Sequence, residues 1–409
     1  MSNLYPPVVA GGYEVRCAAT VDRLRERHEI HVLTSTRQRR RCPPDPLVRR
    51  DLPILPEGRR ALPPAPVAAV QGIRVMRRTL AEVSPELIFV WNGHGIPHTA
   101  LQLAEQSGIP VAYSVGEHWF GRMYRNDPFT RFLLPGEHGV RALWGGFPRL
   151  ANKLPALRVD PRLRARAAIC WNSNAMRRLC GIPPHLTPTY EATIYPAVPE
   201  PERWTRLTRR PSSTPTIAYV GRVEYEKGPD VAYRALAALR DGHGIEARLV
   251  LAGPYSEPMR AELDRLADEL GIAGSVELRG RLDRDAVGRL LEQAHVMLAP
   301  STWEEPFGLV LLEAALARVP VVASRSGGMP EALHEGEQAL FFPIEDHAKC
   351  AEALAAVFEH PSKAQARVQA AFLRASELTF DHYLAQMEHF VSQARASFDT
   401  PIRQIGSPV

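Results

Sequence analysis

The feature that most limits how this chain can fold is the regular alternation of short apolar runs and amphipathic segments in its second half. Six apolar runs predict buried strands, at residues 216–220, 247–252, 275–279, 296–300, 320–323 and 339–342. The segments between them are long enough for helices and have helical periodicity. This pattern predicts a parallel sheet with helices on both faces, the doubly wound arrangement.

The first half shows the same alternation less regularly. A helix is expected over 13–27 and strands over 29–34, 87–91, 110–114 and 168–171, while the many prolines between 42 and 66 predict an irregular loop. A chain of 409 residues exceeds the usual size of one core. We therefore predict an α/β fold of two tandem Rossmann-like domains that face each other across a cleft. The predicted boundaries are 1–198 and 216–376, with a linker at 199–215 and a C-terminal helix at 377–409 that crosses back towards the first domain.

Positive charge is concentrated in the first half. Residues 1–200 contain 27 Lys and Arg against 16 Asp and Glu, whereas residues 201–409 contain 23 against 29. A basic half attracts nucleic acid, phosphorylated substrates or an anionic membrane surface, although a solvated arginine-rich surface explains it equally well. No aromatic-basic motif accompanies the charge, so nucleic-acid binding is only a remote alternative.

The sequence shows neither a membrane span nor a metal or disulfide framework. No apolar stretch reaches about 18 residues and residues 1–7 lack the regions of a signal peptide, so we expect a cytoplasmic protein, peripheral to the membrane at most. Its five cysteines are scattered without a C-x-x-C pair, which favours reduced thiols. His94 and His98 have helical spacing, but Pro97 and the lack of a third ligand argue against a metal site.

Two loops that follow predicted strands carry the charged residues best suited to a ligand. Residues 221–228 place Arg222 and Lys227 at the mouth of the sheet, before a helix N-terminus, which suits a diphosphate better than an ordinary charged turn. After the strand at 296–300, Glu305 precedes a helix expected from about Phe307, and Glu313 follows in its second turn. Carboxylates at these two positions are able to bind the hydroxyls of two different sugar rings.

The motif formed by Glu305, seven residues and Glu313, with Pro306 to Val310 inside it, resembles the signature of the retaining glycosyltransferases of family 4, glycosyl transferases group 1. Four further segments match that family in the same order: 5–14, 28–34, 221–228 and 327–331. The resemblance therefore extends over nearly the whole chain. It implies the GT-B architecture, with the acceptor bound mainly by the N-terminal domain and the donor by the C-terminal one.

The resemblance also implies roles for individual residues. Arg222 and Lys227 would bind the donor diphosphate, Glu313 the ribose and Glu305 a hydroxyl of the transferred sugar. The remaining donor contacts would come from Gly12, Gly221, Arg281, Leu282, Phe307, Gly308, Leu309 and Val310. The implied enzyme is a retaining, metal-independent hexosyltransferase without a cofactor, using a UDP- or GDP-sugar. An epimerase or a phosphorylase-like enzyme of the same fold is the alternative.

The aspartates at 283 and 285 imitate a metal-binding pair, but their place at the start of an amphipathic helix favours N-capping. The chain also departs from the family at two places. Where many members have a His-Asp pair, residues 116–119 read Gly-Glu-His-Trp, so Glu117, His118 and Trp119 are candidates for the acceptor side. Only four residues precede Tyr5, where the family has a full first strand, so the first strand is expected to be truncated or missing.

Overall fold

The computed structural model describes residues 1–9, 11–37, 39, 42–55, 65–127 and 164–399. The chain divides into two compact units, each described here by itself. Unit 1 comprises residues 1–172, 176–194 and those from Leu384 onward, and unit 2 comprises residues 173–175 and 195–383. None of the helices in the described part of the chain is long and apolar enough to cross a membrane.

Unit 2 contains one six-stranded parallel sheet, which confirms the doubly wound fold predicted for it. The strands are β7 (Thr216–Val220), β8 (Arg248–Ala252), β9 (Val276–Gly280), β10 (Val296–Ala299), β11 (Val321–Ser324) and β12 (Leu340–Phe342). Their order across the sheet is β12-β11-β10-β7-β8-β9. The direction of winding therefore reverses between β7 and β10, the position at which ligands bind in open parallel sheets.

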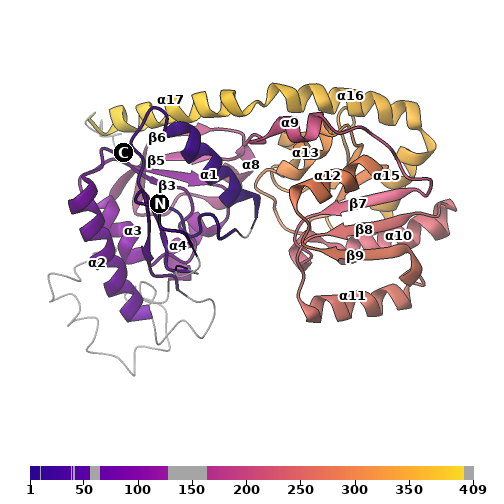
Figure 1. Ribbon diagram of the computed structural model, residues 1–409, viewed down its shortest axis with the longest axis horizontal. Coiled ribbons are helices and arrows are strands. Elements are labelled where there is room, and N and C mark those ends of the chain that lie inside the picture. Colours follow the sequence, from indigo (N-terminus) through magenta and orange to yellow (C-terminus); the bar gives the residue numbers. More distant parts are fainter. Residues whose placement is uncertain (10, 38, 40–41, 56–64, 128–163, 400–409) are drawn as a thin grey trace, which may run out of the picture. The chain divides into compact units, whose positions relative to one another are not determined.

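Both faces of this sheet are covered by apolar helix faces (Figure 1). One face packs on α10 (Pro229–His243), α11 (Glu257–Glu269) and α15 (His347–Glu359). The opposite face packs on α9 (Pro201–Thr205), α12 (Arg284–Gln293), α13 (Leu309–Leu316), α14 (Met329–Ala332) and α16 (Pro361–Glu377). Strands that are covered on both faces consist of almost continuous apolar residues, and this made them predictable from the sequence.

The described residues of unit 1 form two separate parallel sheets. One has four strands in the order β3-β4-β5-β6: β3 (Ile88–Val90), β4 (Val111–Val115), β5 (Ala165–Trp171) and β6 (Leu186–Thr193). The other pairs β1 (Val32–Ser35) with β2 (Val48–Leu52). Its described helices include α1 (Gly12–Leu24), α2 (Ala65–Val83), α3 (His98–Glu105), α4 (Trp119–Asn126) and α8 (Asn174–Cys180). The helix α17 (Phe380–Asp399), at the end of the described residues, enters this unit from Leu384 onward.

One expectation about local structure was wrong: the proline-rich segment 42–66, expected to be an irregular loop, contains β2, which pairs with β1 over residues 48–52. The segment 199–215, expected to be the linker, contains α9, whose Trp204 is buried against the sheet of unit 2. The helix expected from about Phe307 begins two residues later, at Leu309, because Gly308 takes a left-handed conformation that ends the preceding loop.

Candidate active site

The candidate site of unit 2 is built on the loop that follows β7. That loop ends in a short 3-10 turn over Tyr225–Lys227 and then at Gly228, whose φ of 64° favours glycine. A Cβ at Gly228 would also clash with the carbonyl oxygen of Pro300, at the end of β10. The loops after β7 and β10 therefore pack directly on each other, and Thr302 N–H donates to the Glu226 carbonyl at 3.0 Å.

Lys227 and Glu305 meet where these loops touch. Lys227 Nζ lies 2.5 Å from Glu305 Oε1, and both side chains are largely buried. The same carboxylate oxygen accepts a hydrogen bond from Ser301 Oγ, and Lys227 Nζ lies 5.2 Å from the centre of the Trp303 ring. A buried ion pair needs such additional contacts to offset its desolvation. The structure thus brings together two of the three residues expected to be catalytic, and it adds Ser301 and Trp303 beside them.

Arg222 follows β7 and pairs with a carboxylate of its own loop, since its guanidinium contacts the Glu224 side chain. Its side chain is 38% exposed, so a ligand from solvent has access to it. The neighbouring Gly221 donates its N–H to the Ala252 carbonyl at 3.0 Å, and the Gly221 carbonyl occupies the space that a Cβ at Gly253 would need. The turns after β7 and β8 are therefore held closely together.

Helix α13 begins beside this cluster. Gly308, with φ of 88°, is its N-cap, and Leu309 and Val310 form its first turn, where backbone N–H groups have no partner within the helix. Phe307 is buried and stacks on Tyr195 with ring centres 5.3 Å apart. One turn further along, burial raises the pKa of the Glu313 carboxyl to about 7, although Arg284 lowers it in part. Glu313 is thus partly protonated near neutral pH.

The loop after β11 closes the site from a third side. Gly327 has φ of 49°, and a Cβ there would clash with the backbone of Glu305. Gly328 N–H donates to the Glu305 carbonyl at 2.7 Å, and Glu305 N–H donates to Ser326 Oγ at 3.0 Å. The backbone at Glu305 is therefore fixed by its neighbours, which favours a defined orientation for its carboxylate.

The loop after β9 carries the two remaining predicted donor residues of unit 2. Arg281 is exposed and Leu282 is partly buried against the core on the α12 side. Asp283 caps α12 by accepting a hydrogen bond from Ala286 N–H at 2.7 Å, and Asp285 pairs with Arg203. The N-capping expected of Asp283 is confirmed.

In unit 1, the structure gives a physical reason for the glycine at position 116. A Cβ at Gly116 would clash with the side chains of Asn172 and Tyr13, so no larger residue fits between them. Tyr13 itself donates from its hydroxyl to the Trp91 carbonyl at 2.6 Å. Around Gly12, by contrast, no atom lies within 4 Å of a Cβ placed there. Within the described residues of unit 1, nothing requires a glycine at that position.

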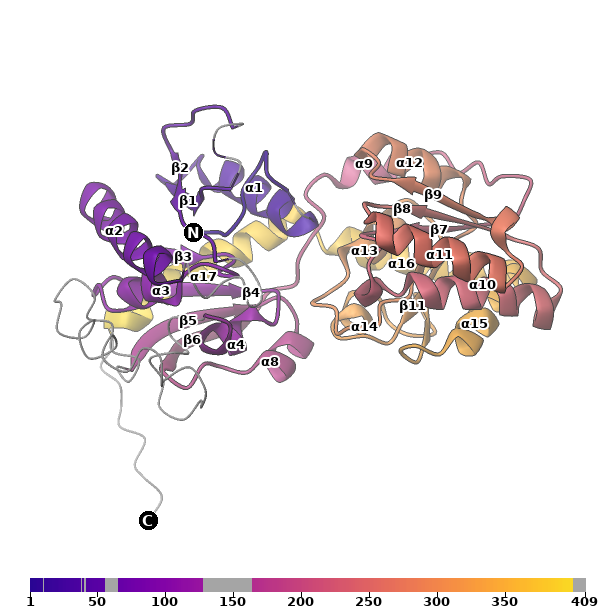
Figure 2. The ribbon, with the colours of Figure 1, turned by 90° about the horizontal axis from the view of Figure 1, so that it is seen from below.

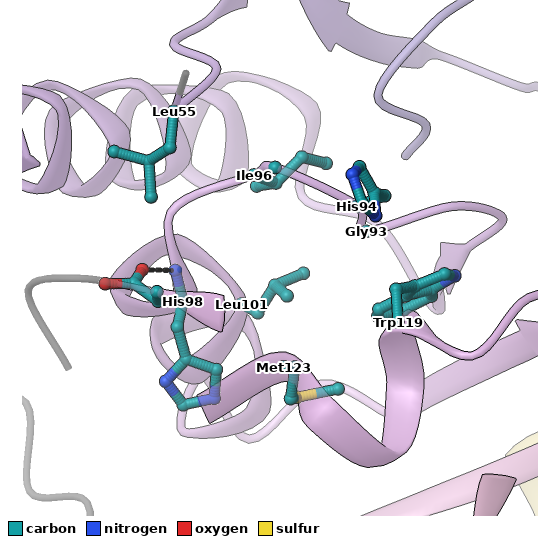
Figure 3. Close-up of a pocket in the computed structure, with 10 residues that line it drawn as sticks. Leu55, Gly93, His94, Ile96, His98, Leu101, Trp119 and Met123 are labelled. Carbon is teal, nitrogen blue, oxygen red and sulfur yellow. Dashed lines mark hydrogen bonds between the residues drawn. The ribbon is translucent and has the colours of Figure 1, made fainter. Parts of the chain in front are cut away.

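The three acceptor-side candidates differ in their surroundings. Glu117 and His118 are partly exposed just before α4, whereas Trp119 is 4% exposed and packs against Tyr113 and Phe120. Trp119 also lines a small cavity of about 30 Å³ (Figure 3). Such a cavity has room for about one or two water molecules, not for a sugar. Trp119 therefore lies in the core of unit 1.

His94 and His98 lie at different sides of that cavity in Figure 3 instead of facing each other. His98 groups with Glu105 and His185, whose possible metal-binding atoms all lie within 4.8 Å of one another. The sequence did not reveal this buried cluster, because His185 is 87 positions from His98 and no motif connects the two. Glu105 already accepts hydrogen bonds from Tyr113 and, at 3.1 Å, from His185 Nε2. This is the pattern of a buried polar network.

Comparison with solved structures shows the fold of the chain. The Anabaena protein Alr3699/HepE in complex with UDP and glucose superposes with a TM-score of 0.63 at 17% identity, covering 94% of this chain and 96% of that one. Sucrose-phosphate synthase from Thermosynechococcus elongatus gives a TM-score of 0.65 at 19% identity, with 95% and 94% covered. The α/β fold predicted from the sequence, with parallel sheets in two domains of the GT-B type, is confirmed.

Similarity in sequence to curated relatives extends over less than half of the chain. A glycogen synthase of Mycobacterium tuberculosis is 38% identical over 173 residues, which are 41% of this chain and 40% of that protein. A D-inositol 3-phosphate glycosyltransferase of Mycolicibacterium paratuberculosis is 34% identical over 195 residues, 47% of this chain and 43% of that protein. The matched part therefore spans less than half the length of these relatives. Residues 202–374 match the model of glycosyl transferases group 1, so this part of the chain is a domain of that family.

Proposed function

We propose that this protein is a retaining glycosyltransferase that transfers a sugar from a nucleotide-diphosphate sugar to an acceptor hydroxyl without a metal ion. The observation that carries the proposal is the meeting of three loops at the reversal point of the unit 2 sheet. They bring Lys227, Glu305 and the first turn of α13 together, and Arg222 follows the same strand as Lys227. Two cations and a helix N-terminus suit a diphosphate.

In this proposal, Arg222 and Lys227 bind the diphosphate, supported by Gly221 and by the backbone N–H groups of Leu309 and Val310. Both cations contact carboxylates in the structure, Arg222 with Glu224 and Lys227 with Glu305. A diphosphate offers stronger charge-assisted hydrogen bonds than one carboxylate, so donor binding shifts the cations towards it. Glu305 is then available to accept a hydrogen bond from the transferred sugar.

The other proposed donor-binding residues contact the nucleoside part of the donor. Glu313, one helical turn beyond Val310, accepts hydrogen bonds from the ribose, and the loop with Arg281 and Leu282 holds the base. Phe307 supports this region through its stacking on Tyr195. We propose UDP as the nucleotide because the Anabaena neighbour was solved with UDP and glucose. We propose a hexose as the transferred sugar for the same reason, because glucose is bound in that neighbour.

The proposed reaction breaks the bond between the anomeric carbon and the diphosphate oxygen. A bond from the acceptor oxygen forms on the same face, so the configuration is retained, and the acceptor proton moves to the departing diphosphate. Arg222, Lys227 and the N-terminus of α13 stabilise the negative charge that develops on that diphosphate. This charge stabilisation takes the place of a divalent cation.

Unit 1 is proposed to bind the acceptor. Glu117 and His118 are the polar candidates, and Trp119 positions α4 from the core without contacting the acceptor. Gly12, where a side chain would meet nothing inside unit 1, is proposed to approach the donor phosphate. The excess of arginine and lysine in residues 1–200 supports a peripheral contact with an anionic membrane surface or an anionic acceptor.

A thermal-shift screen of nucleotides and nucleotide sugars in the presence of EDTA tests the proposal. A ligand at about 100 times its dissociation constant stabilises a protein by about 2.7 kcal/mol, which gives a readable shift. We expect UDP and UDP-sugars to raise the melting temperature. A folded protein that no nucleotide stabilises would contradict the proposal. Products formed by incubation with the stabilising sugar then separate transfer from the alternatives, because an epimerase yields only an isomeric donor.

A further inference from the structure

An asparagine at the carboxyl end of the unit 1 sheet has a buried side chain for which the described part of the fold provides no partner. β4 and β5 are neighbouring parallel strands (Figure 2), and Asn172 directly follows β5. Asn172 is 4% exposed, and its backbone N–H donates to the Val115 carbonyl at 3.1 Å. Its side-chain carboxamide makes no hydrogen bond to any residue that the structure describes. Carboxamides buried this deeply normally have partners, so this one requires an explanation.

The position of the carboxamide is fixed by close packing. Gly116 directly follows β4, and a Cβ there would clash with the Asn172 carboxamide and with the Tyr13 ring. Glycine at this position therefore leaves room for both side chains. Any larger residue would displace the carboxamide from the end of the sheet.

Tyr13 forms one wall beside the carboxamide and has hydrogen-bond partners of its own. Its hydroxyl lies 2.6 Å from the Trp91 carbonyl oxygen and 3.3 Å from the Ser114 carbonyl oxygen. The Arg16 guanidinium lies 5.2 Å from the centre of the Tyr13 ring. Tyr13 thus connects the ends of β3 and β4 and holds a fixed orientation, while its hydroxyl is used by the backbone and not by Asn172.

N-capping of α8, the ordinary structural role of an asparagine just ahead of a helix, is filled by another residue. The helix begins at Asn174, and the N–H groups of Asn174 and Ala175 donate to the Glu331 carboxylate at 2.8 and 2.6 Å. These three residues all belong to unit 2. Among the described residues, Asn172 therefore has neither a capping role nor a side-chain partner.

The chemistry of the group indicates what it binds. A carboxamide both donates and accepts hydrogen bonds, as a sugar hydroxyl does, and it has no charge with which to attract a phosphate. Both of its polar atoms keep some access to solvent, although the residue as a whole is buried. It also lies beyond the carboxyl ends of parallel strands, where ligands of such sheets bind.

We propose that the Asn172 carboxamide binds a hydroxyl of a sugar at the carboxyl ends of β4 and β5. This inference rests on the proposed function, because it assigns a contact to the sugar that unit 1 would hold. The acceptor and the transferred sugar of the donor offer the same hydroxyl chemistry, and the experiment separates them. Asn172 is a binding residue, and the charge stabilisation of the reaction stays with unit 2.

Two variants and a control test the proposal. Asn172→Leu keeps the branched shape of the side chain but removes the amide, and Asn172→Ala repeats the removal without filling the space. Gln71→Leu, which exchanges an exposed carboxamide on α2 for the same apolar group, is the control. Asn172→Leu should leave the melting temperature unchanged, because it breaks no hydrogen bond among the described residues.

Binding is measured with defined probes. Glucose, mannose and galactose are titrated with and without UDP, and UDP and UDP-glucose are titrated separately by calorimetry. In protein labelled with 15N-asparagine, the side-chain signal of Asn172 is identified by its absence from Asn172→Leu. A shift of that signal on addition of a sugar reports contact at the carboxamide itself.

We expect at least one free sugar to shift the Asn172 signal and to bind about tenfold more weakly to both Asn172 variants than to the wild type and to Gln71→Leu. UDP should bind all four proteins equally. A similar loss for UDP-glucose alone, with a shift of the Asn172 signal by UDP-glucose, would assign the same hydroxyl site to the donor's sugar.

The absence of a signal shift with every free sugar and with UDP-glucose would overturn the proposal. Sugar affinities of the Asn172 variants equal to those of the wild type would also overturn it, and a fall in melting temperature without a loss of sugar affinity would show a structural role instead. Failure of the wild type to bind UDP would contradict the proposed function separately, because the titrations of free sugars do not require UDP.

Discussion

At the level of single residues, Glu313 combines a proposed role in binding with an unusual protonation. Burial raises the pKa of its carboxyl in the folded protein to about 7 from an ordinary value of 4.5. The folded state therefore binds more protons than the unfolded state between these pH values, and the free energy of unfolding falls as pH rises through them. The ionised form is the better acceptor for ribose hydroxyls.

Two opposite pH dependences follow for Glu313. As pH rises from about 5 to about 7.5, the wild type should lose stability relative to Glu313→Gln, while its affinity for UDP should increase. The variant should show a flatter profile in both measurements. Thermal unfolding and calorimetric titration at four pH values check this. Parallel profiles for wild type and variant would show that the Glu313 carboxyl is not the titrating group.

Replacing each of the two cations in turn should lower activity in both cases but should change the melting temperature in only one. Arg222→Gln and Lys227→Met should each lower kcat/KM by about tenfold to 150-fold, the equivalent of about 1.5–3 kcal/mol for a hydrogen bond to a charged group. Lys227→Met should also lower the melting temperature, because it removes the ion-pair partner of buried Glu305. Arg222→Gln should leave the melting temperature unchanged, since its side chain is 38% exposed.

Arg265→Gln, which changes a surface arginine on α11 paired with Glu269, is the control for these variants. Its kcat/KM should equal that of the wild type. If Arg222→Gln behaves like this control, Arg222 does not contact the donor.

The sequence predicts the residue types of the candidate site but not how they pair. Arg222, Lys227, Glu305 and Glu313 were chosen because they follow strands and match a family motif. That Lys227 contacts Glu305 was not predictable, because this contact depends on how the loops after β7 and β10 pack. Trp119 was chosen by its place beside Glu117 and His118, and its burial depends on distant residues such as Tyr113.

At the level of elements, the turn from β7 into α10 depends on Gly228. Gly228→Ala introduces a Cβ at φ of 64° that clashes with the Pro300 carbonyl, and we expect a loss of about 1–3 kcal/mol in stability. Because the loop carries Lys227, activity should fall as well. Gly242→Ala is the matched control, since Gly242 lies in the last turn of the same helix with no atom near the added Cβ.

We expect Gly242→Ala to be neutral or to stabilise by up to about 1 kcal/mol, as alanine does in helices. Chemical denaturation of the two variants checks both values. Equal stability of the two variants would mean that the loop moves freely away from β10.

The polar network of α3, β4 and the residue before β6 depends on Glu105, which accepts hydrogen bonds from Tyr113 and His185. Glu105→Gln should cost about 1–3 kcal/mol, the usual effect of a disturbed buried hydrogen bond. Glu269→Gln on the surface of α11 should cost far less. EDTA should leave the melting temperature of the wild type unchanged. A clear fall with EDTA would instead identify His98, Glu105 and His185 as metal ligands.

Elements with a strong apolar pattern were predictable and the others were not. All six strands of unit 2 were predicted to within about two residues, because strands covered on both faces show continuous apolar runs. The strand β2 was missed because its sequence, Val-Arg-Arg-Asp-Leu, is polar at three of five positions. It forms through pairing with β1, which no local pattern reveals.

At the level of the whole molecule, the two-unit α/β architecture was predictable while the substrates remain proposals. The fold followed from the strand–helix alternation, and the neighbours cover at least 94% of the chain. The specificity of the donor site depends on a few contacts that leave little trace in sequence, such as those of the loop after β9. The direct test therefore concerns nucleotide binding by the intact chain.

Calorimetric titration of UDP in EDTA at pH 7.5, with the wild type, Glu305→Gln and Glu313→Gln, tests whether unit 2 binds the donor nucleotide through Glu313 without a metal ion. UDP contains the ribose and the diphosphate but no sugar to transfer. We predict that the wild type binds one UDP without metal, that Glu305→Gln binds it within about threefold, and that Glu313→Gln binds it at least about tenfold more weakly. No binding by the wild type, binding only after manganese is added, or the reverse order of the two variants would contradict the account.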